Sequence, residues 1–176
     1  MAPPRRIALA TKNEHKLVEI TRICSDWSVE WVTIRDRDPG TFPDVDEIGD
    51  TYLDNASLKA RAVADALGIP ALADDSGIEV DALGGRPGPR SARFAGPDAT
   101  DERNLAELIR SIRGIPAAGL TARYRCVAAS VAPGGGLVSA EGLCEGTLTT
   151  RPRGKKDRIS HRGRAFRALR ALLSDE

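Results

Sequence analysis

The stretch ALADDSGIEVDAL, residues 71–83, places two adjacent aspartates between two short apolar runs. Residues 71–73 and 78–83 have the apolar character of buried strands, whereas residues 74–77 have the Asp, Ser and Gly composition that tight turns prefer. We therefore predict a strand, a turn and a second strand here. Glycine and proline then predict a loop over residues 84–89, because neither residue type continues a helix or a strand easily.

Helical and extended patterns alternate on both sides of this stretch. The strongest helix prediction covers residues 51–67, where small apolar residues share one face and Gly68 and Pro70 mark the end. Other helices are predicted over residues 13–24, 100–113 and from about 162 onward, and strands over residues 6–11, 29–34, 120–132 and 137–150, the last two joined by a hairpin at residues 133–136.

Length and composition predict one domain over residues 1–176, large enough to bury a hydrophobic core without metal or disulfide support. No apolar run approaches the roughly 20 residues that cross a bilayer, and the apolar segment after the basic start is too short for a secretion signal. We therefore expect a cytoplasmic protein without a membrane association. The three cysteines are widely spaced and form no Cys-x-x-Cys pair, which argues against a zinc site.

Charge is distributed unevenly although the net charge is only +1. Residues 151–176 carry nine Lys or Arg against three acids, so the first 150 residues have an acidic excess. Such a distribution suits a nucleic-acid-binding tail, and it equally suits a cleft in which carboxylates hold a metal and cations meet phosphates. Composition alone leaves both interpretations open.

A phosphate site is predicted where the first strand turns into the first helix. Thr11, Asn13 and Lys16 lie at this junction, where free backbone N–H groups and the helix dipole attract an anion. The alternative is that Thr11 or Asn13 only caps the helix. The motif by itself does not decide between these roles.

A hard metal ion is one receiver for the adjacent carboxylates Asp74 and Asp75, although an exposed turn explains them equally well. The upstream acids Asp44, Asp46, Glu47 and Asp50 could add a ligand or could simply form a solvated helix start. Three further groups are candidate ligand contacts, each with an exposed polar surface as the alternative. They are Asn55 with Lys59, four residues apart on one helix face, Ser76, and His161 with Arg162 before the last helix.

Taken in order, five segments of this sequence resemble the Ham1/inosine triphosphate pyrophosphatase family. They are LATKNEHK at residues 9–16, DNASLKA at residues 54–60, ADDSG at residues 73–77, GGRPGPRSARFAG at residues 84–96 and ISHRG at residues 159–163. The resemblance implies an α/β fold with a long, curved mixed sheet, flanking helices and two lobes around a central cleft. It also implies a homodimer that hydrolyses noncanonical purine nucleoside triphosphates to monophosphate and pyrophosphate with Mg²⁺.

The resemblance further implies roles for individual residues. Metal ligands would be Glu47, Asp74 and Asp75, and Asp75 would also be the catalytic base that activates water. Contacts to the nucleotide would come from a larger set, namely Thr11, Asn13, Lys16, Asn55, Lys59, Ser76, Lys156, His161 and Arg162. This assignment is chemically coherent, since a metal polarises the phosphoryl oxygen while lysines neutralise the leaving phosphates.

One departure from the family pattern concerns base recognition. The family carries a Phe-Gly-Tyr-Asp-Pro loop before the Ser-His-Arg helix, whereas this chain runs from Thr150 directly through RPRGKKDRIS and contains no Phe or Tyr between Tyr124 and Phe166. Base stacking is worth about 1–3 kcal/mol, so its loss would weaken affinity and blur base choice.

Three functions therefore stand as hypotheses. The first is a nucleoside triphosphate pyrophosphatase, and the second is a repurposed hydrolase that acts on the phosphate or the N-glycosidic bond of a nucleoside monophosphate. The third is a non-catalytic nucleotide- or RNA-binding protein that uses the basic segment of residues 151–170. Nucleic acid is the less favoured partner, because an anion-binding surface gains nothing from Glu47, Asp74 and Asp75.

Overall fold

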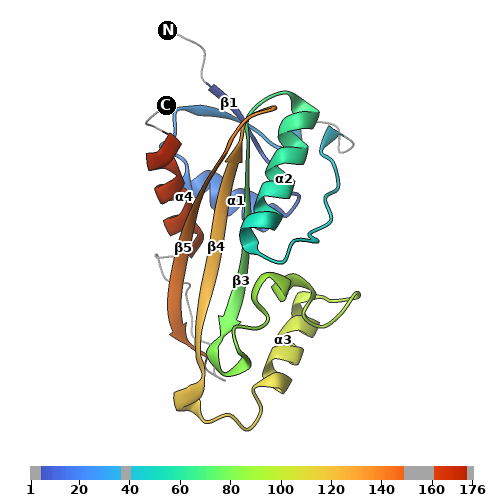
Figure 1. The fold of residues 1–176 in the computed structure, drawn as a ribbon, viewed down its shortest axis with the longest axis vertical. Helices are drawn as coiled ribbons and strands as arrows, with labels where there is room; N and C mark the ends of the chain where they lie inside the picture. The colour runs from blue at the N-terminus through green and yellow to red at the C-terminus, as the bar shows by residue number, and fades with distance from the viewer. Residues whose placement is uncertain (1–4, 37–40, 149–160, 174–176) are drawn as a thin grey trace.

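The computed structural model describes residues 5–36, 41–148 and 161–173. Its centre is a five-stranded mixed sheet with the order β2-β1-β3-β4-β5 (Figure 1). β1 is parallel to β2 and β3, whereas β3, β4 and β5 are antiparallel neighbours. The strands are β1 at Arg5–Leu9, β2 at Val29–Val32, β3 at Ala71–Val80, β4 at Thr121–Val131 and β5 at Leu137–Thr147.

Helices cover both faces of this sheet, so the predicted α/β class with a mixed sheet is confirmed (Figure 1). The α-helices are α1 at Glu14–Ile23, α2 at Tyr52–Leu67, α3 at Asp101–Ser111 and α4 at His161–Leu173. Short 3₁₀ turns fill the connections, namely η1 at Ile34–Asp36, η3 at Asp81–Leu83, η4 at Gly88–Arg93 and η5 at Ala117–Gly119. No helix of the described part is long and apolar enough to cross a membrane.

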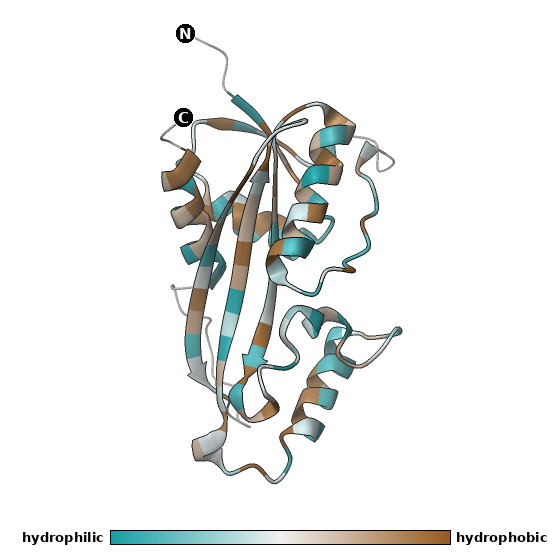
Figure 2. Ribbon diagram, in the orientation of Figure 1, coloured by the Kyte–Doolittle hydropathy of each residue, from teal (hydrophilic) through white to brown (hydrophobic). Residues whose placement is uncertain are grey.

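Alternation along the strands builds two cores on opposite faces of the sheet. On β1, Ile7 and Leu9 join the core under α1 and α4, whereas Ala8 and Ala10 join the core under α2. Alanine predominates on the α2 side, and this allows the helix to lie close to the sheet. A third, smaller core connects α3 with the ends of β3 and β4. Figure 2 shows hydrophobic and hydrophilic residues alternating along α2 and α3, as expected for helices half buried in these cores.

The helix starts follow the capping signals in the sequence. Asn13, Thr51 and Thr100 are the N-caps of α1, α2 and α3, and each side chain accepts a hydrogen bond from the backbone three residues on. Thr51 and Asp54 form a capping box, and Gly68 ends α2 with φ of 65°, a conformation that glycine adopts without steric cost. The predictions for these helices are confirmed to within two residues.

The prediction of a turn at residues 74–77 is wrong, because β3 runs without interruption from Ala71 to Val80. Asp74, Asp75, Ser76 and Gly77 are all paired with β4. The composition that favours a turn is overridden because cations on both faces of the sheet compensate the two carboxylates, so a strand can carry them into the interior. The predicted second strand also ends early, at Val80, where η3 begins.

β1 is short, and its early end leaves part of one edge of β3 unpaired. β1 ends at Leu9 opposite Leu72, so none of the described strands pairs with this edge of β3 beyond Ala73. β3, β4 and β5 continue past this point toward the lobe that contains α3 (Figure 1). A common space therefore lies between three parts of the molecule. They are the lobe that contains β1, α1 and α2, the unpaired edge of β3, and η4 in the lobe that contains α3.

Three expectations fall outside the described residues. They are the extension of the last strand to Thr150, the role of Lys156, and the segment that replaces the Phe-Gly-Tyr-Asp-Pro loop.

Candidate active site

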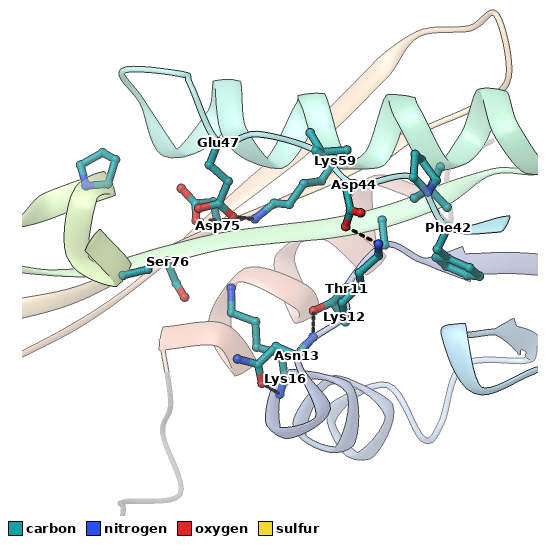
Figure 3. A pocket seen from close by; sticks show the side chains of 16 residues that line it. Thr11, Lys12, Asn13, Lys16, Phe42, Asp44, Glu47, Lys59, Asp75 and Ser76 are labelled. Atoms are coloured by element: carbon teal, nitrogen blue, oxygen red, sulfur yellow. Dashed lines mark hydrogen bonds and ion pairs between the residues drawn. The ribbon is translucent and has the colours of Figure 1, made fainter. Parts of the chain in front are cut away.

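A cavity of about 320 Å³ opens where β1 ends (Figure 3). Its walls come from the β1–α1 junction, the loop before α2, α2 itself, β3 and η4. The polar lining residues are Thr11, Lys12, Asn13, Lys16, Asp44, Glu47, Lys59, Asp75 and Ser76. Seven of the predicted site residues therefore line one cavity, namely Thr11, Asn13, Lys16, Glu47, Lys59, Asp75 and Ser76.

The N-terminus of α1 forms one wall. Asn13 accepts a hydrogen bond from the backbone N–H of Lys16 at 3.1 Å, and Thr11 Oγ1 accepts one from the backbone of Asn13 at 3.2 Å. The capping role is thus present, and it is compatible with anion binding, because the same helix end faces the cavity. Lys16 extends from this turn toward β3 (Figure 3).

Two carboxylates and one ammonium group form the opposite wall. Lys59 Nζ lies 2.6 Å from Glu47 Oε1 and 3.7 Å from Asp75 Oδ1, so both carboxylates converge on one cation. Asn55 is fully buried behind them, and its side-chain amide donates to Asp75 Oδ2 at 3.1 Å. Its Oδ1 accepts from the backbone of Gly49 at 2.8 Å, so Asn55 joins Asp75 to the loop that carries Glu47.

Asp74 lies on the other face of β3, as strand alternation requires. Its Oδ2 is 3.3 Å from Lys16 Nζ and 3.1 Å from Arg162 Nε, and its side chain is completely buried. Arg162 also contacts Glu19 and donates to Ser76 Oγ at 3.0 Å. Asp74 Oδ1 is buried without a hydrogen-bond partner among the described residues. Figure 3 shows Asp75 and Ser76 on opposite sides of β3.

These different surroundings shift the two carboxyl pKa values in opposite directions. Burial raises the pKa of Asp75, and the nearby Glu47 carboxylate adds to this rise, which Lys59 and Asn55 only partly oppose. Burial would also raise the pKa of Asp74, but Lys16, Arg162 and Lys59 outweigh it and hold that pKa well below the usual range. Burial lowers the pKa of Lys16, yet the attraction of Asp74 leaves it raised.

The start of α4 brings the last two predicted residues to the sheet. Arg162 is buried in the network around Asp74 and does not line the cavity, and His161 stacks on Tyr124 with ring centroids 5.0 Å apart. Sequence reasoning did not single out Glu19 or Tyr124. Glu19 follows Lys16 by three residues and so shares its helix face, which is a usable signal, whereas the position of Tyr124 beside α4 depends on the tertiary structure.

The metal ligands predicted from the sequence do not all meet. Glu47 and Asp75 are joined through Lys59, but Asp74 points away from them. Within the described ranges no group of three or more His, Cys, Asp or Glu side chains is arranged to hold a metal ion. A cation here would therefore take two ligands from these carboxylates.

Comparison with known proteins identifies the family to which this chain belongs. Residues 7–157 match the model of the family described as the Ham1 family, which covers most of the chain. This chain belongs to the Ham1 family. The family match includes β1 from Ile7 onward, α1, α2 and all of β3, and it contains every residue of the cavity wall described above.

Two curated relatives of this Ham1 chain are dITP/XTP pyrophosphatases. It is 43% identical over 151 residues to a dITP/XTP pyrophosphatase of Geobacillus kaustophilus, covering 86% of this chain and 73% of that protein. It is 39% identical to a dITP/XTP pyrophosphatase of Desulforamulus reducens, covering 96% of both chains. The structure resembles a HAM1 protein from Coxiella burnetii with a TM-score of 0.83 and 30% identity, covering 98% of this chain and 100% of the other.

The alignment with the Desulforamulus reducens protein is longer than this chain. It spans 194 positions, whereas the chain has 176 residues. Part of that relative therefore has no counterpart in this sequence.

Proposed function

We propose that this chain hydrolyses purine nucleoside triphosphates, including noncanonical ones, to the monophosphate and pyrophosphate. The observation that carries the proposal is the composition of the cavity, in which the N-terminus of α1 with Lys16 faces the Glu47–Lys59–Asp75 cluster. A triphosphate needs both features, because its oxygens require cations and backbone donors while its hydrolysis requires an activated water. The name shared by the curated relatives supports the same reaction.

The chain offers three groups for the phosphates. The side chains of Thr11 and Asn13 accept hydrogen bonds from the backbone at the start of α1, and this helix end lines the cavity. Lys16 lies in the first turn and lines the cavity as well. Lys59 approaches from α2 on the other side. Cations on two sides suit an extended anion, since each further phosphate adds negative charge that must be neutralised.

Magnesium fits the pair of Glu47 and Asp75. Their carboxylates already converge on the Lys59 ammonium group, and oxygen ligands are the ones that Mg²⁺ prefers. Two protein carboxylates are a typical share for Mg²⁺, which usually takes its remaining ligands from water and substrate phosphates. When bound, the ion would polarise the phosphoryl oxygen and lower the pKa of water.

Asp75 is our proposed base. Burial raises the pKa of Asp75 above its usual range, which is the direction that strengthens a general base. Asn55 fixes the orientation of the carboxylate through Oδ2 and leaves Oδ1 toward Lys59. We assign Asp74 a different task from the metal ligation expected from the sequence, namely holding Lys16 and Arg162 in place.

One experiment tests the reaction directly. Purified protein is incubated with Mg²⁺ and a panel of nucleoside mono-, di- and triphosphates, and products are identified by mass. We expect monophosphate and pyrophosphate from triphosphates, at least with dITP or XTP. Release of phosphate or free base from a monophosphate would instead support the repurposed hydrolase, and no product with any nucleotide would support the non-catalytic binding protein.

We also propose that the protein forms a homodimer and acts in the cytoplasm, where its nucleotide substrates occur. Sedimentation at micromolar concentration tests the dimer, and a single species with the mass of one chain would contradict it.

A further inference from the structure

Tyr124 is the single exposed aromatic side chain of this protein. The sequence contains seven aromatic residues, and all of them lie in the described ranges. Six are buried or packed into the cores, namely Trp27, Trp31, Phe42, Tyr52, Phe94 and Phe166, whereas the Tyr124 residue is 49% exposed. Packing of the cores therefore does not explain the exposed ring of Tyr124 on the interior strand β4.

The ring of Tyr124 is held in a defined orientation. His161, the first residue of α4, stacks on it with ring centroids 5.0 Å apart and an angle of 19° between the planes. The position of His161 is itself fixed, because Gly142 on β5 lies directly under the first turn of α4 and Arg162 ties that turn to Asp74. Tyr124 is thus a prepared flat surface, and stacking on it would cost little side-chain entropy.

A small, largely apolar cavity lies next to this ring. It has a volume of about 170 Å³, and Ile78, Tyr124 and Cys144 line it as one row across β3, β4 and β5. Ala122 and Leu148 add further apolar groups, while Arg123, Glu145 and Thr147 add polar ones. An apolar site with an aromatic wall and few polar groups is the composition expected for a flat heterocycle.

Both cavities reach the face of β3 that carries Ser76 and Ile78, although the phosphate cavity also has the Glu47–Lys59–Asp75 wall on the opposite face. Ser76 lines the phosphate cavity, and Ile78 lines the second cavity two residues further along β3 on the same face. Two residues of a strand span about 6.5 Å. That separation matches the place of a sugar between the phosphates and the base of one nucleotide.

We propose that Tyr124, supported by His161, is the surface on which the nucleotide base stacks in this protein. The inference rests on the proposed function and refines it, because it names the residue that binds the base in a chain whose sequence has no Phe or Tyr between Tyr124 and Phe166. Stacking uses the π-face that every base has, so this surface binds bases without distinguishing among them.

Binding of inosine monophosphate and of ribose 5-phosphate, measured by calorimetry, tests the proposal. The two ligands differ only in the base, so the ratio of their dissociation constants isolates its contribution. We expect wild-type protein to bind inosine monophosphate roughly 10-fold or more tightly than ribose 5-phosphate. Tyr124→Leu should bring that ratio close to one and leave ribose 5-phosphate binding unchanged, whereas Tyr124→Phe should preserve the ratio.

Two results would overturn the stacking role. One is a ratio that Tyr124→Leu leaves unchanged, and the other is an equal loss in Tyr124→Phe and Tyr124→Leu, which would assign the effect to the hydroxyl group. Thermal melting of each variant checks that the sheet remains folded. Because the measurement is binding, it separates this inference from the proposed reaction, whose own failure would appear as absent turnover in wild-type protein.

Discussion

Asp74 and Asp75 are neighbours in the chain but have opposite electrostatic surroundings. Asp74 is enclosed by Lys16 and Arg162, which favour its charged form. Asp75 is buried beside another carboxylate, that of Glu47, and its charged form is disfavoured although Lys59 is close. A strand places successive side chains on opposite faces, so these two neighbouring residues lie in different environments. The charged form is stabilised at Asp74 and destabilised at Asp75.

We predict that Asp75→Asn lowers turnover at least ~100-fold without lowering thermal stability, because it removes the proposed base. The folded-state pKa of Asp75 is raised, so its favourable contribution is complete only below the unfolded pKa of about 4 and is lost as pH rises through the folded pKa. At neutral pH a permanently neutral Asn avoids this cost. Product assays and melting curves at pH 7.5 check both parts, and full activity in the variant would refute the base assignment.

For Asp74→Asn we predict the opposite result, a loss of stability of about 3–5 kcal/mol, because the buried Arg162 and the partly buried Lys16 lose their shared anionic partner. The folded-state pKa of Asp74 is lowered, so its contribution is present above the unfolded pKa of about 4 and disappears as pH falls below it.

Urea unfolding at pH 7 measures this loss, with Asp75→Asn as the matched control on the adjacent residue. A midpoint for Asp74→Asn equal to that of Asp75→Asn would contradict the opposite assignments. The wild type should also lose stability in acid over a range in which Asp74→Asn changes less.

At the scale of elements, α4 and β5 meet through a glycine. A Cβ atom added to Gly142 would lie 2.1 Å from the carbonyl oxygen of His161 and 2.4 Å from the backbone nitrogen of Ala165. Backbone atoms cannot rotate away, so this close approach needs a residue without a side chain. The first turn of α4 also carries Arg162, and a packing contact on β5 therefore sets the position of a side chain in the Asp74 network.

We predict that Gly142→Ala destabilises the protein by about 1–3 kcal/mol, since the added methyl group must push α4 away from the sheet. Gly146→Ala is the matched control on the same strand, because nothing lies within 4 Å of a Cβ atom there. Denaturant unfolding of both variants measures the difference. Equal stability of the two variants would show that α4 does not depend on this contact.

In the whole molecule, the two lobes and the open edge of β3 surround the cavity that holds the proposed phosphate contacts Thr11, Asn13, Lys16 and Lys59. The sequence between Thr150 and Ser160 lacks the Phe-Gly-Tyr-Asp-Pro loop that the family resemblance implies, and we propose that base recognition differs for this reason. A site that reads a base edge by hydrogen bonds rejects other bases strongly, whereas stacking alone does not.

We predict weak discrimination among bases for this reason. Values of kcat/KM for ITP, XTP, GTP and ATP, measured in one buffer with one Mg²⁺ concentration, should lie closer together than in a stringent inosine triphosphate pyrophosphatase, or a monophosphate should be preferred. IMP and GMP are therefore included. A preference of several orders of magnitude for ITP or XTP over both GTP and ATP, without monophosphate turnover, would show that the lost segment is dispensable.

Local sequence signals were sufficient to predict where three helices begin and several of the residues that line the cavity. Caps at Asn13, Thr51 and Thr100 act through hydrogen bonds within three residues, so the starts of their helices could be predicted from the chain. The order of motifs was sufficient to identify most of the residues that line the cavity, although not the partners of each.

The conformation of residues 74–77 depends on tertiary contacts. Their composition favours a turn, but residues far away in sequence, Lys16, Lys59 and Arg162, supply the charges that allow two carboxylates inside one continuous strand. The same distant contacts separate Asp74 from Asp75 and bring His161 onto Tyr124. Interactions between residues distant in sequence exist only once the sheet has formed, and local patterns therefore could not predict them.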